Sequence, residues 1–427
     1  MRLVIPAEEA DSVKLTVLPS GVRILTKSQP EVRSATIGFW VAVGSRDEAP
    51  GGYGSTHFLE HLLFKGTKTR SAWDIAAAFD AVGGEFNAST SKESTCYYAR
   101  VLGADAPMAI ATLADMVTSS VLDPLDFENE RAVILEELAM NQDDPVDVAH
   151  EAFAGAVYGS HPLGRPIAGR SADIKAVERD QVWDHYQRFY TPSRLIVTVT
   201  GAFAAGAVVE GVAEALDLGG WSAASRGTEP AKGRRPTSPA VALPVQGTAQ
   251  AVGKPTEQAQ VLIGCAGLTA TDQRRHALSV VATVLGGGMS SRLFQEVREK
   301  RGLAYSTYCF ASSHSDAGSF GLYAGCSPAA SSEVERLLDA EFERLAADGI
   351  SAEELARAQG QLRGSTLLSL EDPYSAMNRL GRAELLMGEL PTVDQMVARI
   401  NAVTREDVQE LAADLAGRAR SRVVVGP

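Results

Sequence analysis

Long hydrophobic runs are absent from the 427-residue sequence. No stretch reaches the roughly 18 consecutive apolar residues that a membrane-spanning helix requires. The N-terminal segment contains one short apolar patch and then acidic residues, whereas a secretory signal needs a basic start and a longer apolar core. We therefore expect a cytoplasmic protein with no leader peptide and no membrane partner.

Cysteine is also scarce. The four cysteines, Cys96, Cys265, Cys309 and Cys326, are widely scattered and show none of the paired spacings of a metal site. We interpret them as buried or incidental thiols in a reducing cytoplasm, where disulfides are rare.

Basic residues are outnumbered by acidic ones. The chain has 40 Lys and Arg against 53 Asp and Glu, a net charge of −13, which argues against a nucleic-acid partner because such surfaces are basic. An acidic balance is compatible with cationic partners such as basic peptides. The composition, 45% hydrophobic and 22% charged, is that of an ordinary globular protein whose length allows two or three domains.

Residues 222–240 form a candidate linker. This segment, "SAASRGTEPAKGRRPTSPA", is rich in Pro, Gly, Ser and Arg and shows no apolar period, which is typical of an exposed connector. It separates two parts of similar length, and we predict that residues 1–221 and 241–427 are two domains.

The two parts show a similar order of predicted elements. The first contains a hairpin signal in "VKLTVLPSGVRILTKSQ", a segment that alternates like a strand in "EFNASTSKESTCYYARVL", and helices in "SAWDIAAAFDAVGG" and "DAPMAIATLADMVTSSV". The second contains a strand in "AQVLIGCAGL", a helix in "RRHALSVVATVLGGG" and a hairpin in "LAYSTYCFASSHSDAGSFGLYAGC".

An Asp-Pro step recurs late in both parts, at Asp144-Pro145 and Asp372-Pro373. We interpret the repeated order as an internal duplication. The predicted fold class is therefore α+β, with two homologous domains that each contain a mostly antiparallel sheet packed with helices.

Two of the seven histidines lie within five residues of each other, in "HFLEH". On a helix His57, Glu60 and His61 share one face, because their offsets are three and four residues. The two imidazoles can then bind one Zn²⁺, and the glutamate between them can take a proton from water. Composition alone would produce this pattern by accident with a probability on the order of one per cent. We therefore prefer a metal site to a structural pair of histidines.

A catalytic zinc site needs a third protein ligand. The acidic segment "FENERAVILEELAMNQDDP" offers Glu130, Glu136 and Glu137. On a helix Glu130 and Glu137 share one stripe, whereas Glu136 lies about 100° away from Glu137. Periodicity thus favours the face of Glu130 and Glu137 only modestly over Glu136, and we rank Glu137 barely ahead.

Three stretches together, "GSTHFLEHLLFKGT", "FNASTSKESTCYYARVL" and "ERAVILEELAMNQDDP", resemble the pitrilysin (M16) family of zinc metallopeptidases. The likeness covers nearly the whole chain and is greatest to the short bacterial branch related to the β subunit of the mitochondrial processing peptidase, so it implies that fold. The family's third ligand lies seven positions after another family glutamate. Glu137 and Glu130 match these positions, which implies that Glu137 is a ligand and that Glu130 orients the site.

The resemblance also implies residues that contact the substrate. "FNAST" matches an edge strand that pairs with an extended peptide, and Asn87 and Ala88 match the residues that contact the scissile peptide. A plain edge strand is the alternative. "SSRLFQEVREKRGLAYS" matches an Arg/Tyr pair, Arg298 and Tyr305, that can stabilise the oxyanion; without the resemblance we would interpret these two residues as structural.

The function implied is that of a zinc endopeptidase with one Zn²⁺ per chain, which cleaves short or unfolded peptides in an enclosed chamber with Glu60 as general base. Longer members of the family build the chamber from four domains, so a two-domain chain implies a homodimer or a heterodimer with a homologous subunit. The segment "LGGGMSSRLF" lacks the long glycine-rich loop of the inactive subunit class. The alternative is a non-catalytic peptide-binding or scaffold subunit of the same fold.

Overall fold

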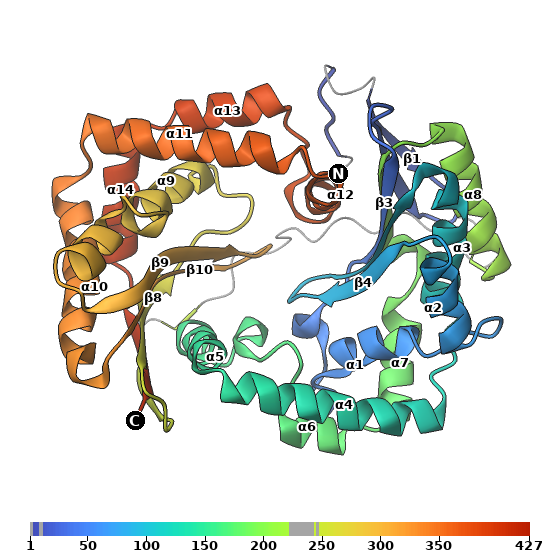
Figure 1. The fold of residues 1–427 in the computed structure, drawn as a ribbon, viewed down its shortest axis with the longest axis horizontal. Coiled ribbons are helices and arrows are strands. Elements are labelled where there is room, and N and C mark those ends of the chain that lie inside the picture. Colours follow the sequence, from blue (N-terminus) through green and yellow to red (C-terminus); the bar gives the residue numbers. More distant parts are fainter. Residues whose placement is uncertain (1–2, 8–11, 222–242, 245–246) are drawn as a thin grey trace. The chain divides into compact units, whose positions relative to one another are not determined.

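The structure is a computed structural model that describes residues 3–7, 12–221, 243–244 and 247–427. The chain divides into two compact units (Figure 1). The first consists of Met1–Leu138, Pro166–Arg234 and Leu368–Thr392, and the second of Ala139–Arg165, Arg235–Leu367 and Val393–Pro427. Each unit contains one sheet with helices packed on it, so the predicted α+β class is confirmed.

The sheet of the first unit has the strand order β1-β2-β6-β3-β5-β4. All neighbours are antiparallel except β2 and β6, which are parallel. The strands are β1 (Val13–Val17), β2 (Arg23–Ser28), β3 (Ser34–Val41), β4 (Glu85–Thr90), β5 (Thr95–Leu102) and β6 (Leu195–Gly201). Among the described strands, β4 is last in this order and pairs with β5 alone, so one of its edges is open.

Helices cover both faces of this sheet. The helices of the unit are α1 (Ser55–Leu63), α2 (Ala72–Asp80), α3 (Ala106–Ser119), the greater part of α4 (Pro124–Asp143), α6 (Ser171–Ala176), α7 (Arg179–Phe189), α8 (Ala205–Leu218) and α12 (Pro373–Arg382), which continues into a π-helical turn (Ala383–Met387). Side chains on alternate positions of β3 enter different cores: Ile37 and Phe39 belong to the large core beneath α1 and α3, and Trp40 packs with Met377 and Leu380 of α12.

The second unit has a five-stranded sheet with the order β7-β11-β8-β10-β9. Its strands are β7 (Ala249–Gly253), β8 (Ala259–Ala266), β9 (Ala304–Ser313), β10 (Gly318–Cys326) and β11 (Ser421–Gly426), and only β7 and β11 pair in parallel. Its helices are α5 (Pro145–Tyr158), α9 (Arg275–Gly286), α10 (Ser331–Asp348), most of α11 (Ala352–Ser369), α13 (Val393–Asn401) and α14 (Arg405–Ala416), together with a π-helical segment (Phe294–Glu299). One core lies among α9, α10, α14 and the sheet, and a second lies between the sheet and α5.

The compact units differ from the contiguous halves expected from the sequence. Helix α5 belongs to the second unit although it precedes residue 221, and α12 belongs to the first unit although it follows residue 241. Both helices begin at the repeated Asp-Pro steps, where Asp144 and Asp372 cap the first turn. Each covers a sheet face with buried apolar side chains. The predicted linker, 222–240, lies outside the described residues.

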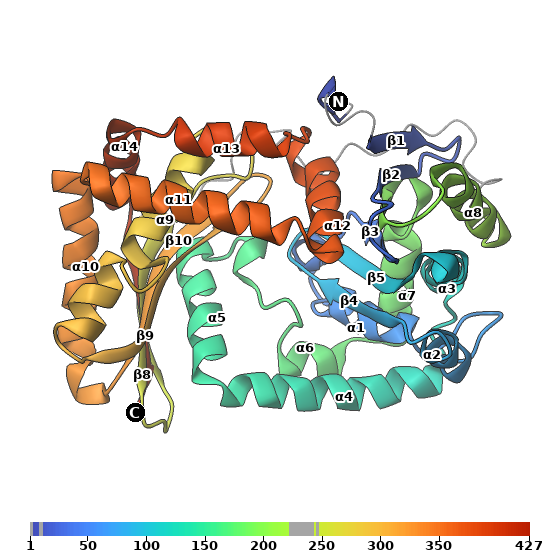
Figure 2. The same cartoon turned by 45° about the horizontal axis from the view of Figure 1, so that its top comes forward.

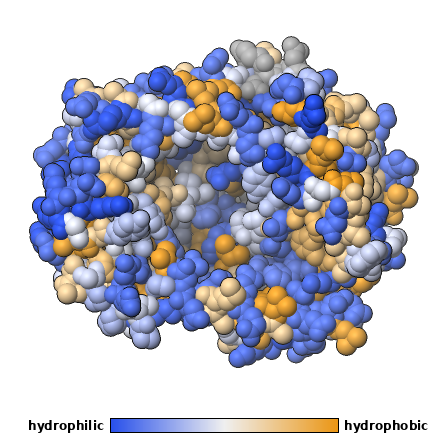
Figure 3. Space-filling view, viewed as in Figure 1, coloured by the Kyte–Doolittle hydropathy of each residue, from blue (hydrophilic) through white to orange (hydrophobic). Residues whose placement is uncertain are grey.

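No helix among the described residues is both long enough and apolar enough to cross a membrane. On the face drawn in Figure 3, hydrophilic residues predominate and apolar residues occur in small groups among them.

Candidate metal centre

Helix α1 places the three motif residues on the side of the helix that faces away from the apolar core. Phe58, Leu59, Leu62 and Leu63 are fully buried in that core. The helix is therefore fixed by its apolar stripe. His57 and His61 lie one turn apart, with ring centroids separated by 4.7 Å.

Glu137 reaches this pair from α4, which lies beside α1 in both ribbon views (Figures 1 and 2). Its Oε1 lies 3.6 Å from Nε2 of His57, and its Oε2 lies 3.5 Å from Nε2 of His61. One donor atom from each of the three residues lies within 4.8 Å of the other two. Glu136 is exposed and does not belong to this group.

These distances suit a shared cation better than direct hydrogen bonds. At 3.5–3.6 Å the atoms lie beyond hydrogen-bonding range. Ligands of a tetrahedral Zn²⁺ at 2.0–2.2 Å lie about 3.4 Å from one another. Two imidazoles and a carboxylate are also ligands that zinc accepts, so the residues present fit this metal.

A buried acid orients one of the two imidazoles. Oε2 of Glu130 lies 3.0 Å from Nδ1 of His61, and its Oε1 lies 2.7 Å from Nζ of Lys65. Glu130 is 5% exposed. A hydrogen bond at Nδ1 leaves Nε2 of His61 as the lone-pair donor, the atom that faces Glu137. Lys65 supplies the positive charge that the buried Glu130 carboxylate needs.

Glu60 is held by the neighbouring strand. Its carboxylate accepts a hydrogen bond from the hydroxyl of Thr90 in β4. Burial raises the pKa of Glu60, while the hydrogen bond from Thr90 and the nearby His61 counteract this effect. A carboxylate whose pKa is raised in this way is a better base for water than an exposed one.

Burial has the opposite effect on His57. Desolvation, reinforced by the proximity of His61, lowers the pKa of His57 to about 4. Its imidazole is therefore neutral near pH 7, which is the form that binds a metal.

Strand β4 runs along the open edge of the sheet next to this site. Asn87 and Ala88 lie in the middle of it, and Oδ1 of Asn87 accepts a hydrogen bond from the N–H of Ala88 at 2.8 Å. Thr90, which holds Glu60, is two residues further along the same strand. Strand β4 thus provides both the open edge and the hydroxyl that holds Glu60, which lies on the same helix as the two imidazoles.

Arg298 and Tyr305 lie together in the second unit. The guanidinium carbon of Arg298 is 4.4 Å from the centroid of the Tyr305 ring, and its Nη1 donates to the Tyr305 carbonyl at 2.8 Å. Tyr305 is 74% exposed. The pair is therefore preassembled, with the tyrosine available to a ligand.

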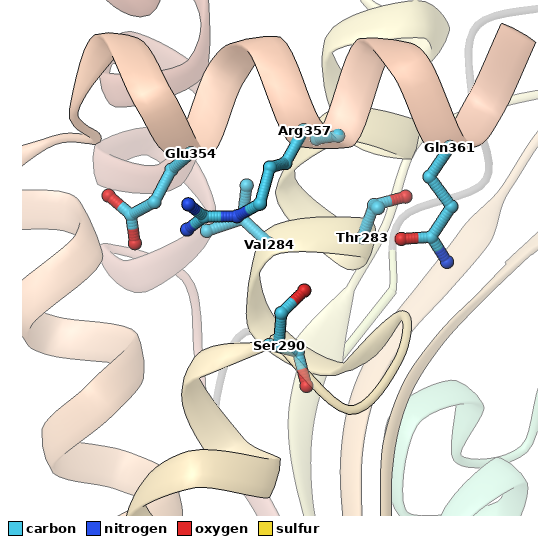
Figure 4. A pocket seen from close by; sticks show the side chains of 8 residues that line it. Thr283, Val284, Ser290, Glu354, Arg357 and Gln361 are labelled. Carbon is cyan, nitrogen blue, oxygen red and sulfur yellow. The ribbon is translucent and has the colours of Figure 1, made fainter.

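A small pocket also lies in the second unit, between α9, the segment after it, and α11 (Figure 4). Its lining includes Thr283, Ser290, Glu354 and Gln361. Glu354 is paired with Arg292, with Nε and Oε1 2.7 Å apart. We assign this pocket no chemistry.

Two residues of the site were not predicted from the sequence, Thr90 and Lys65. Lys65 lies two residues beyond the end of α1, so the helical spacing of the motif does not specify its position. Thr90 could be found only by knowing that β4 lies beside α1.

Comparison with other proteins identifies the family. A model of the insulinase family of peptidases (M16) matches residues 23–171, and a model of the peptidase M16 inactive domain matches residues 176–362. A protein of Streptomyces coelicolor named as an uncharacterized zinc protease is 48% identical over 418 residues, which cover 97% of this chain and 90% of that protein. The chain belongs to the M16 peptidase family. The resemblance noted from the sequence is thereby confirmed.

Other M16 relatives extend the likeness along the whole chain. An uncharacterized zinc protease of Mycobacterium tuberculosis is 43% identical over 432 residues, covering 99% of this chain and 95% of that protein. One of Bacillus subtilis is 38% identical, covering 97% and 98%.

Solved structures agree with the fold. A protease from Helicobacter pylori superposes with a TM-score of 0.88 at 23% identity, covering 97% of this chain and 99% of that one. A structure described as the peptidase M16 inactive domain from Pseudomonas fluorescens gives a TM-score of 0.86 at 20% identity, covering 97% and 98%. Membership of the M16 family, with relatives named zinc proteases, supports a metallopeptidase function.

Proposed function

We propose that the protein is a zinc-dependent endopeptidase whose metal is held by His57, His61 and Glu137. The observation that carries this proposal is the convergence of the three donor groups at distances suited to one Zn²⁺. Zn²⁺ held there would act as a Lewis acid on the scissile carbonyl and make water acidic enough to react near neutral pH.

Glu60 acts as the general base in this proposal. Its carboxylate, held by Thr90, takes a proton from the attacking water and passes it to the leaving amine. Glu130 keeps the imidazole of His61 in the required tautomer.

Substrate binding uses the open edge of β4. An extended peptide adds to this edge by main-chain hydrogen bonds next to Asn87 and Ala88, which makes binding tolerant of sequence. Arg298 and Tyr305 donate to the oxyanion that forms at the scissile carbonyl.

We further propose that the site works within an assembly of two chains, either a homodimer or a heterodimer with a homologous subunit, which encloses short or unfolded peptides. All four cysteines are free thiols, in keeping with the proposed location in a reducing cytoplasm. The intact donor set does not favour the alternative of a non-catalytic scaffold.

The test is Glu60→Gln. Removal of the base should lower the rate of cleavage of an unstructured peptide by at least about 100-fold while zinc remains bound, because Glu60 is not among the ligands. Glu136→Gln, a change at an exposed acid of α4, is the control and should leave the rate unchanged. Cleavage by the Glu60→Gln variant at the wild-type rate would show that the base is assigned wrongly.

A further inference from the structure

Helix α1 has no side-chain cap of its own. Its N-cap residue is Gly54, whose φ of 88° is in the left-handed region. A side chain here is excluded by packing as well as by strain, because an added Cβ would lie 2.4 Å from Cδ1 of Ile174. The N–H groups of the first turn must therefore find another acceptor.

Glu48 supplies that acceptor from six residues upstream. Its Oε2 accepts the N–H of Gly54 at 2.9 Å, and its Oε1 accepts the N–H of Thr56 at 2.8 Å. Glu48 is only 6% exposed. Since Thr56 directly precedes His57, this buried carboxylate fixes the backbone turn from which the first imidazole projects.

The segment that carries Glu48 is itself anchored. The N–H groups of Ser45 and Arg46 donate to the carbonyl oxygens of Ser91 and Lys92, both at 3.1 Å. These two acceptors lie in the turn after β4, the strand whose Thr90 holds Glu60. One connected set of hydrogen bonds thus fixes the start of α1 and the edge strand together.

The charge of Glu48 has a second consequence. The N-terminus of a helix carries a partial positive charge that falls off within the first turn. His57 is the third residue of α1, so a dication held by it would lie near this unfavourable end. A carboxylate bonded to the N–H groups of the same turn offsets that charge.

We propose that Glu48 is a positioning residue for the metal centre: its carboxylate fixes the first turn of α1 and offsets the positive helix end, and thereby strengthens zinc binding. The inference rests on the proposed zinc site. Glu48 is separate from the ligands and acts through the backbone of α1.

The experiment measures Zn²⁺ affinity by competition with a chromophoric chelator in Glu48→Gln and Glu48→Asp. The glutamine keeps the shape but loses the charge, and its NH₂ group faces an N–H donor. We expect its zinc affinity to fall about tenfold, the size of effect that partners of metal ligands produce. The aspartate keeps the charge, so its affinity should lie between those of Glu48→Gln and the wild type.

Glu384→Gln is the matched control. Glu384 is a buried acid of the same unit, 4% exposed, but it pairs with Arg23 at 2.5 Å, and its neighbours Ala383 and Leu385 belong to a different core from the apolar residues of α1. This variant should melt at a lower temperature without any change in zinc affinity. If Glu48→Gln behaves in the same way, the role is structural and the inference is wrong. If the wild-type chain binds no zinc, or binds it equally well after His57→Ala, the proposed function fails instead.

Discussion

Glu136 and Glu137 are adjacent in sequence but face different surroundings on α4. Glu137 lies 3.5–3.6 Å from both imidazoles, and Glu136 is exposed. We expect Glu137→Ala to weaken zinc binding by more than the roughly 10–100-fold that partners of ligands contribute, whereas Glu136→Ala should bind zinc like the wild type. Metal analysis of the dialysed variants measures this. Equal zinc contents would remove Glu137 from the ligand set.

At the same scale, the sequence predicts only what local spacing encodes. His57, Glu60 and His61 lie within two helical turns, so the helical period alone places them together. Glu137 is brought to them by the packing of α4 on α1. Helical periodicity could not distinguish Glu137 from Glu130 as the third ligand, and the family resemblance favoured Glu137. Thr90 acts across the space between two elements, and its role became visible only with the fold.

Helices α1 and α7 meet through a buried histidine. Nε2 of His185 in α7 lies 3.2 Å from Oγ1 of Thr56, and burial, aided by Arg188, lowers the pKa of His185 to about 4. Between this value and the ordinary 6.5, the unfolded chain binds a proton that the folded chain does not, so stability falls as the pH falls through that window. At pH 5 the free energy of unfolding has therefore lost about 2 kcal/mol that the neutral His185 contributes at higher pH.

Urea unfolding of zinc-free wild type and His185→Gln at pH 7.5 and pH 5 measures this contribution. His57, whose pKa is also lowered to about 4, is present in both proteins and cancels in the comparison. The loss of stability between the two pH values should be about 2 kcal/mol smaller in the variant. If the wild type and the variant lose the same free energy of unfolding between pH 7.5 and pH 5, His185 is not held in its neutral form.

The open edge of β4 predicts that substrate binding depends on the main-chain N–H groups of the peptide. If a peptide binds as an added strand, methylation of one of its main-chain N–H groups near the scissile bond removes a hydrogen bond. Each such methyl group should lower kcat/KM at least about fivefold, corresponding to roughly 1 kcal/mol. Methylation near the peptide ends is the control and should have little effect. If methyl groups at every position of the peptide lower kcat/KM equally, strand addition at Asn87 and Ala88 is wrong.

Elements were predictable where their pattern is local. The segment "EFNASTSKESTCYYARVL" alternates as a strand does, and it forms two strands, β4 and β5, where the pattern predicted one. Strand β6 was not predicted. It is buried along its whole length in the middle of the sheet, and its sequence, LIVTVTG, joins an apolar start to only a short Val-Thr alternation. Its parallel pairing with β2 joins residues about 170 positions apart, which no local signal specifies.

For the whole molecule, the repeated Asp-Pro steps proved more informative than the linker. They begin α5 and α12, the two helices that belong to the unit opposite to their place in the sequence. A capping aspartate followed by proline predicts where a helix starts. It does not say which sheet that helix covers, because buried apolar residues such as Met377 suit either sheet. The repeated order of elements was therefore visible in the sequence, whereas the assignment of α5 to the second unit and of α12 to the first was not.

Assembly of two chains makes a prediction that only mixed chains can test. If Arg298 and Tyr305 serve the metal site of the other chain, a Glu60→Gln chain still lends its Arg298 to a partner. A partner with Arg298→Ala keeps its own Glu60, so the mixed dimer regains one complete site. After equal mixing and random exchange, activity should recover to about a quarter of the wild-type level, although each variant alone is nearly inactive. Peptide cleavage before and after mixing measures this, and absence of recovery despite exchange would indicate that each site is completed within one chain.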